Sequence, residues 1–229
     1  MIPLAADARV LVFDVNETLT DMGPLADRFT AAGLPGRLLP LWFAGVLRDG
    51  VALTLAGGHA SFAAVARDGL CAMAADEGLP EPRRAADQIL AGLTELPLHP
   101  DIPEGVRALR AAGFRLLTLT NGAAETTRAV LDRAGLTDLF EAHLDVNTPA
   151  RWKPARAAYA HALDTANVPA AAALLVSVHP WDIDGAARAG LATAWLRRTR
   201  APYPLARRAA DLTAASLPEL ADRLNPPAR

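Results

Sequence analysis

Four polar segments of the chain carry side chains that could form a hydrolytic site. They are residues 14–18 (DVNET), 120–122 (TNG), 151–154 (RWKP) and 177–182 (SVHPWD). They include the carboxylates of Asp14 and Asp182, the ammonium group of Lys153, and several hydroxyl and amide groups. A carboxylate that must stay ionised and nucleophilic inside a cleft needs a cation beside it, and Lys153 could meet this need for Asp14. The hydroxyl groups of Thr18 and Thr120 would then orient substrate and carboxylate oxygens.

Each of these residues also has an ordinary structural explanation. Asp14 could cap a turn, Asn121-Gly122 could form a plain turn, and Lys153 could be a solvated lysine at the start of a helix. Asp182 and Asp184 could interact with the N-terminal end of a helix dipole. We favour a functional site because all four segments occur together, in order, at the ends of predicted strands or the starts of helices.

The elements that position these segments alternate between strand and helix. Apolar runs with the length of buried parallel strands cover residues 10–13, 114–119, 174–178 and 192–196. Helical spacing of apolar residues, with glycine or proline near the ends, predicts helices over residues 104–112, 123–134 and 154–166. This alternation predicts an α/β fold with a doubly wound, Rossmann-like parallel sheet. Ligands of such sheets bind at the carboxyl ends of the strands, where the polar segments lie.

Residues 20–97 interrupt this alternation. They contain helix-like segments at 24–32, 38–48, 61–77 and 82–93, and no convincing strand. We therefore predict a core domain of residues 1–19 and 98–229, with a small all-helical cap domain of residues 20–97 inserted after the first strand. Such an insert would cover the carboxyl ends of the sheet, and with them the polar segments.

Composition excludes several kinds of protein and partner. The formal net charge of the 229-residue chain is −2, which provides no electrostatic basis for binding nucleic acid or an anionic membrane. Cys71 is the only cysteine, so an intramolecular disulfide and a thiolate metal cage are excluded. The N-terminus lacks the pattern of a secretion signal, and no apolar run approaches the ~20 residues of a membrane span. We expect a cytoplasmic protein that acts on a small-molecule substrate.

The polar segments carry a resemblance to the haloacid dehalogenase superfamily. Its members have a strand ending in an Asp nucleophile, a strand ending in Ser/Thr-Asn, a Lys-Pro helix start, and an acidic loop before a helix. The matching segments here are VLVFDVNET, LLTLTNG, WKP and LLVSVHPWDIDGA, in that order and over most of the chain. The resemblance implies a hydrolase in which Asp14 forms an aspartyl-ester intermediate.

Position 16 distinguishes between subgroups of this superfamily. Its phosphatases usually have a second Asp two residues after the nucleophile, which protonates the leaving alcohol and then serves as a base. Asn16 occupies this position here, and an amide cannot transfer that proton at neutral pH. The acidic loop of those phosphatases usually begins with Gly-Asp near Mg²⁺, whereas this chain has Ser177-Val178. Both replacements favour a leaving group that needs no proton.

The chain is most similar to the type II L-2-haloacid dehalogenases, which use neither a metal nor a cofactor and release a halide. WKPARAAY places Tyr159 six residues after Lys153, as in those enzymes, and SVHPWD is similar to their Ser-Ser-Asn-Ala-Trp-Asp loop. The resemblance implies that Asp14 attacks C2 of a small 2-haloacid and that water then hydrolyses the ester. It implies four catalytic residues, which are Asp14, Thr18, Lys153 and Asp182. The substrate-binding residues that it implies are Thr120, Asn121, Tyr159, Ser177, His179, Phe43 and Phe62.

Two positions depart from the dehalogenase pattern. Phe43 aligns with an Arg of the cap that normally holds the halide, and losing this cation would weaken halide stabilisation by about 1–3 kcal/mol if nothing replaces it. His179 stands where these enzymes usually have Asn, and it could donate a hydrogen bond or act as a base in the hydrolytic step. These departures concern the choice of substrate more than the identity of the nucleophile.

Two alternatives remain open. A Mg²⁺-dependent phosphatase of a small phosphomonoester could use Asp14, Asp182 and Asp184 as metal ligands, with Glu17 as the missing acid. Alternation at the strand end predicts that the Glu17 side chain points away from Asp14. A non-catalytic binding protein could also keep this fold, although such a protein has little use for the charge cluster. The resemblance further implies a homodimer, which the apolar cap would allow.

Overall fold

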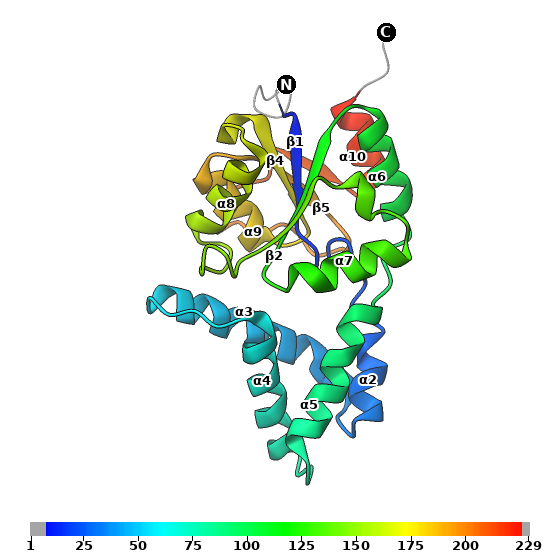
Figure 1. The fold of residues 1–229 in the computed structure, drawn as a ribbon, viewed down its shortest axis with the longest axis vertical. Helices are drawn as coiled ribbons and strands as arrows, with labels where there is room; N and C mark the ends of the chain where they lie inside the picture. Colours follow the sequence, from blue (N-terminus) through cyan, green and yellow to red (C-terminus); the bar gives the residue numbers. More distant parts are fainter. Residues whose placement is uncertain (1–7, 226–229) are drawn as a thin grey trace.

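A parallel sheet lies at the centre of the described part of the protein, residues 8–225 of this computed structural model (Figure 1). The sheet has six strands in the order β3-β2-β1-β4-β5-β6. Every neighbouring pair is parallel. The strands are β1 (Val10–Phe13), β2 (Arg115–Thr120), β3 (Ala142–Asp145), β4 (Ala173–Ser177), β5 (Ala192–Leu196) and β6 (Leu212–Ala214). The predicted doubly wound α/β fold with a helical cap is confirmed.

Helices cover both faces of the sheet because the central strand is apolar on both faces. Leu11 and Phe13 of β1 belong to one buried cluster, with residues of α6 (Ile102–Ala111), α7 (Ala124–Arg133) and α10 (Leu217–Leu224). Val10 and Val12 belong to another, with residues of α8 (Arg156–Ala166) and α9 (Pro180–Ala189). Neighbouring residues of β1 thus point to opposite layers, as the two-residue period of a strand requires.

The two edge strands are absent from the sequence prediction. β3 has the sequence AHLD and every residue is only partly buried, and β6 has only three residues. An edge strand is packed on fewer sides, so it lacks the continuous apolar run that marks a central parallel strand. The strands that were predicted lie within one residue of their observed bounds.

The strand order reverses at β1, which has β2 on one side and β4 on the other. This is the point at which doubly wound sheets bind ligands, beyond the carboxyl ends of the strands. Asp14 follows β1 there, between the ends of β2 and β4. Topology therefore places the predicted nucleophile at the ligand-binding edge of the sheet.

The cap consists of helices that follow β1 and lie across the carboxyl ends of the strands (Figure 1). They are α2 (Leu25–Ala31), α3 (Leu39–Leu55), α4 (Phe62–Asp76) and α5 (Pro82–Ala91), with short 3₁₀ turns at Gly36–Leu38 and Gly92–Glu95. An isolated antiparallel bridge between Thr20 and Leu98 joins the two chain segments at the base of the cap. The division of the chain into domains at residues 20 and 97 stays a prediction, and residues 1–7 and 226–229 of the predicted core lie outside the described residues.

Trp152 fastens the cap to the loop that carries Lys153. Its indole N–H donates to the carbonyl oxygen of Ala60 at 2.9 Å, and its backbone N–H donates to Thr54 Oγ1 at 3.0 Å. Gly50 of α3 makes room for the ring, because a Cβ there would lie 2.3 Å from Trp152 Cε3. The close approach of α3 to this loop therefore requires glycine at position 50.

Segment Gly36–Leu55 is the one stretch within residues 8–225 that is long and apolar enough to cross a membrane by length and composition alone. It is not an uninterrupted apolar run, because it contains Arg37, Arg48 and Asp49. The segment belongs to the cap, where α3 buries Trp42, Phe43 and Val46 in the cluster that also contains Trp152.

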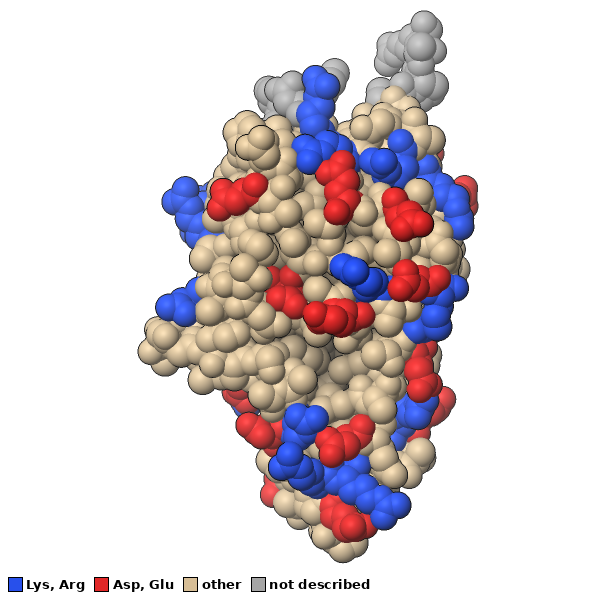
Figure 2. Space-filling view, viewed as in Figure 1, with Lys and Arg blue, Asp and Glu red and all other residues tan. Residues whose placement is uncertain are grey.

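Acidic and basic side chains are mixed on the face of the molecule shown in Figure 2.

Candidate active site

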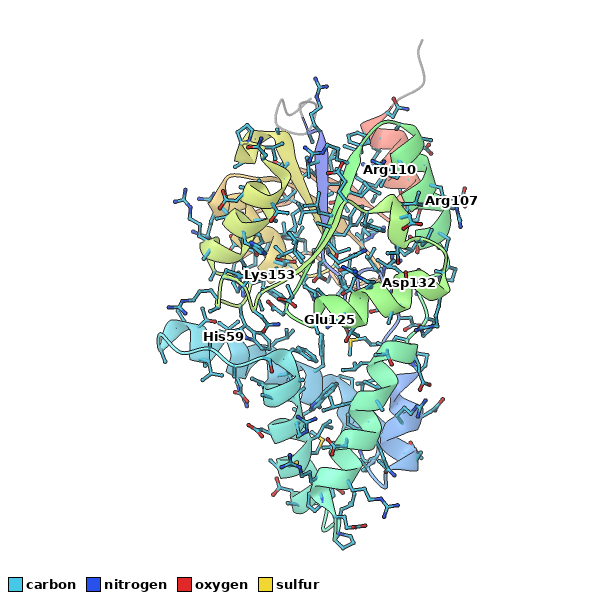
Figure 3. All side chains as sticks on the ribbon, in the orientation of Figure 1. His59, Arg107, Arg110, Glu125, Asp132 and Lys153 are labelled. Atoms are coloured by element: carbon cyan, nitrogen blue, oxygen red, sulfur yellow. The ribbon has the colours of Figure 1, made fainter. Side chains whose placement is uncertain are left out.

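The structure brings Asp14, Lys153 and Asp182 together at the carboxyl edge of the sheet. Lys153 Nζ lies 2.7 Å from Asp14 Oδ1 and 2.8 Å from Asp182 Oδ2. The side chain of Lys153 is 0% exposed. It is the only lysine of the chain, which otherwise uses arginine as its long basic residue. Figure 3 shows Lys153 on the side of the core that faces the cap. Burial of a single ammonium group between two carboxylates is the arrangement expected of a functional charge cluster.

Neighbouring hydroxyl groups complete the hydrogen bonds of this charge cluster. Thr18 Oγ1 donates to Asp14 Oδ2 at 2.5 Å, and itself accepts from the backbone N–H of Val178 at 3.1 Å. Tyr159 donates to Asp182 Oδ1 at 2.6 Å. Both oxygens of Asp182 are therefore occupied, by Lys153 and by Tyr159. The carboxylates of Asp14 and Asp182 are thus held in fixed orientations by hydrogen bonds to buried side chains.

Other predicted site residues hold the backbone of the site. Asn121 Oδ1 accepts from the backbone N–H of Lys153 at 2.8 Å, and its amide donates to the Lys153 carbonyl oxygen at 3.4 Å. Thr120 Oγ1 accepts from Gly122 N–H at 2.9 Å. Ser177 Oγ accepts from the backbone N–H of His179 at 3.1 Å. We therefore assign Asn121 and Ser177 to positioning the loops that carry Lys153 and His179.

The shared charges shift the pKa values of the cluster. Burial raises the pKa of Asp14, but the Lys153 ammonium and then His179 lower it, and the pKa lies below its ordinary value. Burial lowers the pKa of Lys153, but the two carboxylates raise it more, so the pKa lies above its ordinary value. Burial and the Asp14 charge raise the pKa of Asp182 despite the lysine. Asp14 is thus kept as an ionised carboxylate and Lys153 as a cation.

His179 lies on the opposite side of Asp14 from Lys153. Its Nε2 is 3.6 Å from Asp14 Oδ2, 3.7 Å from Glu17 Oε2 and 3.2 Å from the carbonyl oxygen of Asn16. The expected direction of Glu17 is wrong, because β1 ends at Phe13 and Glu17 has a positive φ of 62°, so strand alternation does not reach it. Its carboxylate faces His179 instead. Burial raises the pKa of Glu17, against the effect of His179.

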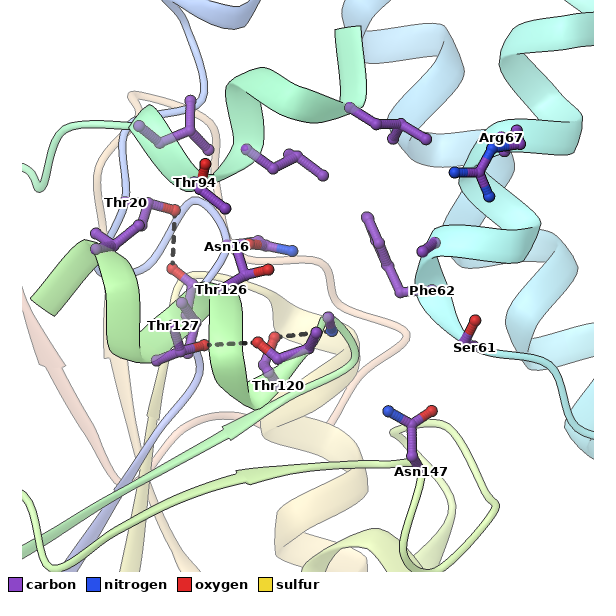
Figure 4. Close-up of a pocket in the computed structure, with 18 residues that line it drawn as sticks. Asn16, Thr20, Ser61, Phe62, Arg67, Thr94, Thr120, Thr126, Thr127 and Asn147 are labelled. Atoms are coloured by element: carbon purple, nitrogen blue, oxygen red, sulfur yellow. Dashed lines mark hydrogen bonds between the residues drawn. The ribbon is translucent and has the colours of Figure 1, made fainter. Parts of the chain in front are cut away.

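Two cavities flank the nucleophile loop. The first, which we call the cap–core cavity, has a volume of about 170 Å³ and lies between α4, the end of β2 and α7 (Figure 4). Asn16 and Phe62 face it from opposite sides, and Asn147 and Thr120 also line it. Of the described residues that line it, Arg67 alone carries a charge, and it also pairs with Asp87 at 2.9 Å.

The second cavity, which we call the His179 cavity, has a volume of about 440 Å³. Glu17, Phe43, His179 and Arg198 are among the residues that line it. The ring of Phe43 lies 6.4 Å from that of His179, centroid to centroid. The two positions that depart from the dehalogenase pattern are therefore neighbours in space, on the Oδ2 side of Asp14.

Sequence reasoning missed several residues around the site. Arg67, Asn147 and Arg198 lie outside the four polar segments, and no local pattern marks them. Arg198 donates to the carbonyl oxygen of Thr18 through Nε at 3.2 Å and Nη2 at 2.9 Å, and so holds the nucleophile loop. For Lys153, which was predicted, the sequence held a further signal. A lone lysine in an arginine-rich chain indicates a role that arginine cannot fill.

The magnesium alternative finds little support in the side chains that it would use. Asp184 pairs with Arg188 at 3.1 Å and lies 3.7 Å from Arg207, so its carboxylate is directed to arginines. Asp14 and Asp182 both bind Lys153. Within residues 8–225, His, Cys, Asp and Glu side chains form no group of three or more that could hold a metal ion.

Comparison with known proteins agrees with this geometry. The family described as haloacid dehalogenase-like hydrolase matches residues 8–190. The chain belongs to this family. It is 30% identical over 221 residues to (S)-2-haloacid dehalogenase 1 of Pseudomonas sp. (strain CBS-3), across 94% of this chain and 97% of that one. The superfamily resemblance inferred from the polar segments is confirmed.

Solved structures of this haloacid dehalogenase-like family are similar over nearly the whole chain. The L-2-haloacid dehalogenase from Xanthobacter autotrophicus is 27% identical, with a TM-score of 0.86 over 96% of this chain and 100% of that one. A second structure of that enzyme, with the same TM-score and identity, has chloropropionic acid covalently bound. The similarity therefore includes both the core and the cap.

Proposed function

We propose that this haloacid dehalogenase-like hydrolase is a metal-independent, cofactor-free dehalogenase of a small 2-haloacid. The observation that carries the proposal is a buried, ionised Asp14 paired with Lys153, in a loop whose position 16 is an amide. Such a nucleophile can displace a group that leaves as a stable anion, and a halide leaves without a proton. The (S)-2-haloacid dehalogenase that is 30% identical over almost the full length supports the same chemistry.

In the first half of the reaction, an oxygen of Asp14 attacks C2 of the haloacid. The new bond joins the carboxylate oxygen to C2, and the carbon–halogen bond breaks with its electron pair leaving on the halide. Asp14 is thereby converted from an anion to a neutral ester, and the halide carries the charge away. Thr18 and Lys153 hold the carboxylate oxygens, so the attacking group is oriented before the substrate arrives.

The cap–core cavity is the proposed binding site for the carbon chain and carboxylate of the substrate. Its volume of about 170 Å³ is below that of ordinary drug-binding pockets, which favours a substrate of few heavy atoms. Phe62 supplies an apolar wall, and Asn16 and Asn147 supply amides. Arg67 provides positive charge at the same cavity for an anionic substrate.

In the second half, water adds to the carbonyl carbon of the aspartyl ester. The negative charge that develops on Asp14 Oδ1 would lie next to the Lys153 ammonium, which is 2.7 Å away and already oriented. Asp182 holds Lys153 from the other side, since both of its oxygens are hydrogen-bonded. The products are a 2-hydroxyacid and the regenerated Asp14 carboxylate.

The experiment that tests this proposal is halide release from both enantiomers of 2-chloropropionate and from haloacetates, in EDTA. Hydrolysis of p-nitrophenyl phosphate with Mg²⁺ is measured alongside. We expect halide release that survives EDTA, favours the L enantiomer and is abolished in Asp14→Asn. The matched control is Asp222→Asn, at an exposed position of α10, which should behave as the wild type. Phosphate release that requires Mg²⁺, without any halide, would contradict the proposal.

A further inference from the structure

The cleavage of the aspartyl ester creates a need for a proton that halide departure does not. When water has added to the ester, the oxygen attached to C2 leaves as an alkoxide of the 2-hydroxyacid. An alkoxide is a poor leaving group at neutral pH unless an acid protonates it as the bond breaks. Position 16 holds an amide, so the residue that supplies this proton must lie elsewhere.

His179 is placed to supply that proton. Its Nε2 lies 3.6 Å from Asp14 Oδ2, the oxygen that is not bound by Lys153. Three oxygen acceptors surround Nε2 within 3.7 Å, on Asp14, Asn16 and Glu17, and such surroundings favour a proton on this nitrogen. A proton on Nε2 is thus hydrogen-bonded to the Asn16 carbonyl oxygen and lies close to Asp14 Oδ2.

The ring is held in this orientation from several sides. It stacks on Trp181 at 5.1 Å between centroids and contacts Phe43 at 6.4 Å. The backbone N–H of His179 donates to Ser177 Oγ at 3.1 Å. A fixed ring loses little freedom when it transfers a proton, which is a requirement for an efficient general acid.

Proton exchange with solvent is available to His179 and not to Asp182. The His179 side chain is 12% exposed and lines the His179 cavity together with Glu17, whose side chain is 47% exposed. Asp182 is 0% exposed, and both of its oxygens are hydrogen-bonded to the charge cluster. Asp21, His99 and Arg198 are the other charged or titratable groups that line the same cavity.

We propose that His179 is the acid that protonates the departing 2-oxygen in ester hydrolysis, and that Glu17 relays protons between His179 and the solvent of the cavity. This assignment rests on the proposed function.

Protons and bonds balance in this step. Water oxygen bonds to the Asp14 carbonyl carbon, and the bond from this carbon to Oδ2 breaks. The electron pair of that bond goes to Oδ2, which leaves with C2 and takes a proton from the imidazolium of His179. Of the two protons of the water, one restores the imidazolium and the other leaves through the Glu17 carboxylate to solvent. Asp14 is left as a carboxylate that contains the oxygen of the water.

The test follows chloride release and the covalent adduct on L-2-chloropropionate for the wild type, His179→Asn, Glu17→Gln and His59→Gln. Chloride is measured with stopped-flow detection, and the adduct by mass spectrometry of acid-quenched protein. For His179→Asn we expect a burst of one chloride per chain, accumulation of the ester on the peptide with Asp14, and a fall in kcat of about 100-fold. Glu17→Gln should show a smaller fall and a detectable adduct, because the imidazole is retained.

His59→Gln is the matched control, since His59 is an exposed histidine of the cap (Figure 3). It should turn over as the wild type does. Wild-type turnover in His179→Asn, with no adduct, would overturn the acid assignment and leave the dehalogenase proposal intact. Loss of the chloride burst in both His179→Asn and Glu17→Gln would also overturn it, because the defect would then precede ester formation. Absence of chloride from the wild type would overturn both proposals.

Discussion

The two carboxylate oxygens of Asp14 lie in different surroundings. Oδ1 binds the ammonium of Lys153, in a cluster with Asp182 and Tyr159 from which solvent is excluded. Oδ2 accepts from Thr18 and lies 3.6 Å from Nε2 of His179, a residue that lines a cavity of about 440 Å³. The Oδ1 side is closed to solvent, whereas the Oδ2 side is next to a residue of this cavity. In the proposed mechanism, one oxygen of Asp14 therefore has its charge stabilised and the other receives the proton.

The largest expected effect belongs to the Oδ1 side. Lys153→Met removes the only cation between two carboxylates, so we expect halide release to fall by about 1000-fold. We also expect the free energy of unfolding to fall by about 3 kcal/mol, because the buried carboxylates of Asp14 and Asp182 both lose their cationic partner. Halide assays and urea unfolding measure the two effects. Arg188→Met, which breaks the more exposed pair with Asp184, is the control and should change either quantity little.

Activity of Lys153→Met within tenfold of the wild type would remove the distinction between the two oxygens. In that case the charge on Oδ1 would not contribute to the reaction, and the cluster would be structural.

A second prediction concerns the pair Phe43 and His179 on the Oδ2 side. Phe43→Arg adds a cation at the position where dehalogenases carry one, and we expect kcat/KM for halide release to rise by about threefold in the wild-type background. In the His179→Asn background the gain in the chloride burst rate should reach about tenfold, because the new guanidinium then has no imidazole beside it as a competing hydrogen-bond donor near Oδ2. A double-mutant cycle measures this coupling. Equal gains in the two backgrounds would show that position 43 acts independently of His179.

The smallest effect is expected at Asp101, which supports the Oδ2 side from a distance. Asp101 accepts from Arg198 at 2.9 Å and from the backbone N–H of Leu217 at 2.8 Å, and Arg198 holds the Thr18 carbonyl oxygen. Burial raises the pKa of Asp101, but these two donors lower it below its ordinary value of 3.8. A carboxyl group with a lowered pKa stabilises the folded state at every pH above its ordinary pKa. This contribution is lost as the pH falls through the lowered pKa.

We therefore expect Asp101→Asn to reduce the free energy of unfolding by about 1 kcal/mol at neutral pH, and by progressively less as the pH falls below 3.8 and through the lowered pKa. Urea unfolding of the wild type and the variant at several pH values measures the difference. A destabilisation that is the same at all pH values would indicate that the negative charge of Asp101 does not contribute to stability. The loss would then come from the changed shape and hydrogen bonding of the side chain alone.

Much of the core was predictable from local patterns. The apolar runs at 10–13 and 192–196 are β1 and β5 without change of bounds, because buried parallel strands need continuous apolar residues. The helix expected to end at Arg48 instead continues to Leu55. Glycine is a common signal for helix termination, but Gly50 lies within α3 and accommodates Trp152 of the core loop. A contact between domains thus overrode a local signal for helix termination.

The candidate site was predictable in its charges and less so in its arrangement. Asp14, Lys153 and Asp182 meet as the order of the strand ends suggests. Asn121 and Ser177 bind backbone groups of neighbouring loops, which a pattern of residue types cannot reveal. The direction of Glu17 depends on a positive φ that L-residues seldom adopt, so a rule based on strand alternation failed there.

By itself, the sequence determined the alternation of strands and helices, the helical insert after β1, and the set of polar residues at the carboxyl ends of the strands. These follow from residue periodicity, which acts over a few positions. Tertiary structure decided which oxygen of Asp14 meets Lys153 and which meets His179, and which residues line each cavity. Asp14 and Lys153 are 139 positions apart, and Glu17 reaches His179 only through its left-handed backbone. Such contacts depend on loop conformation and on the packing of distant segments, so no local pattern encodes them.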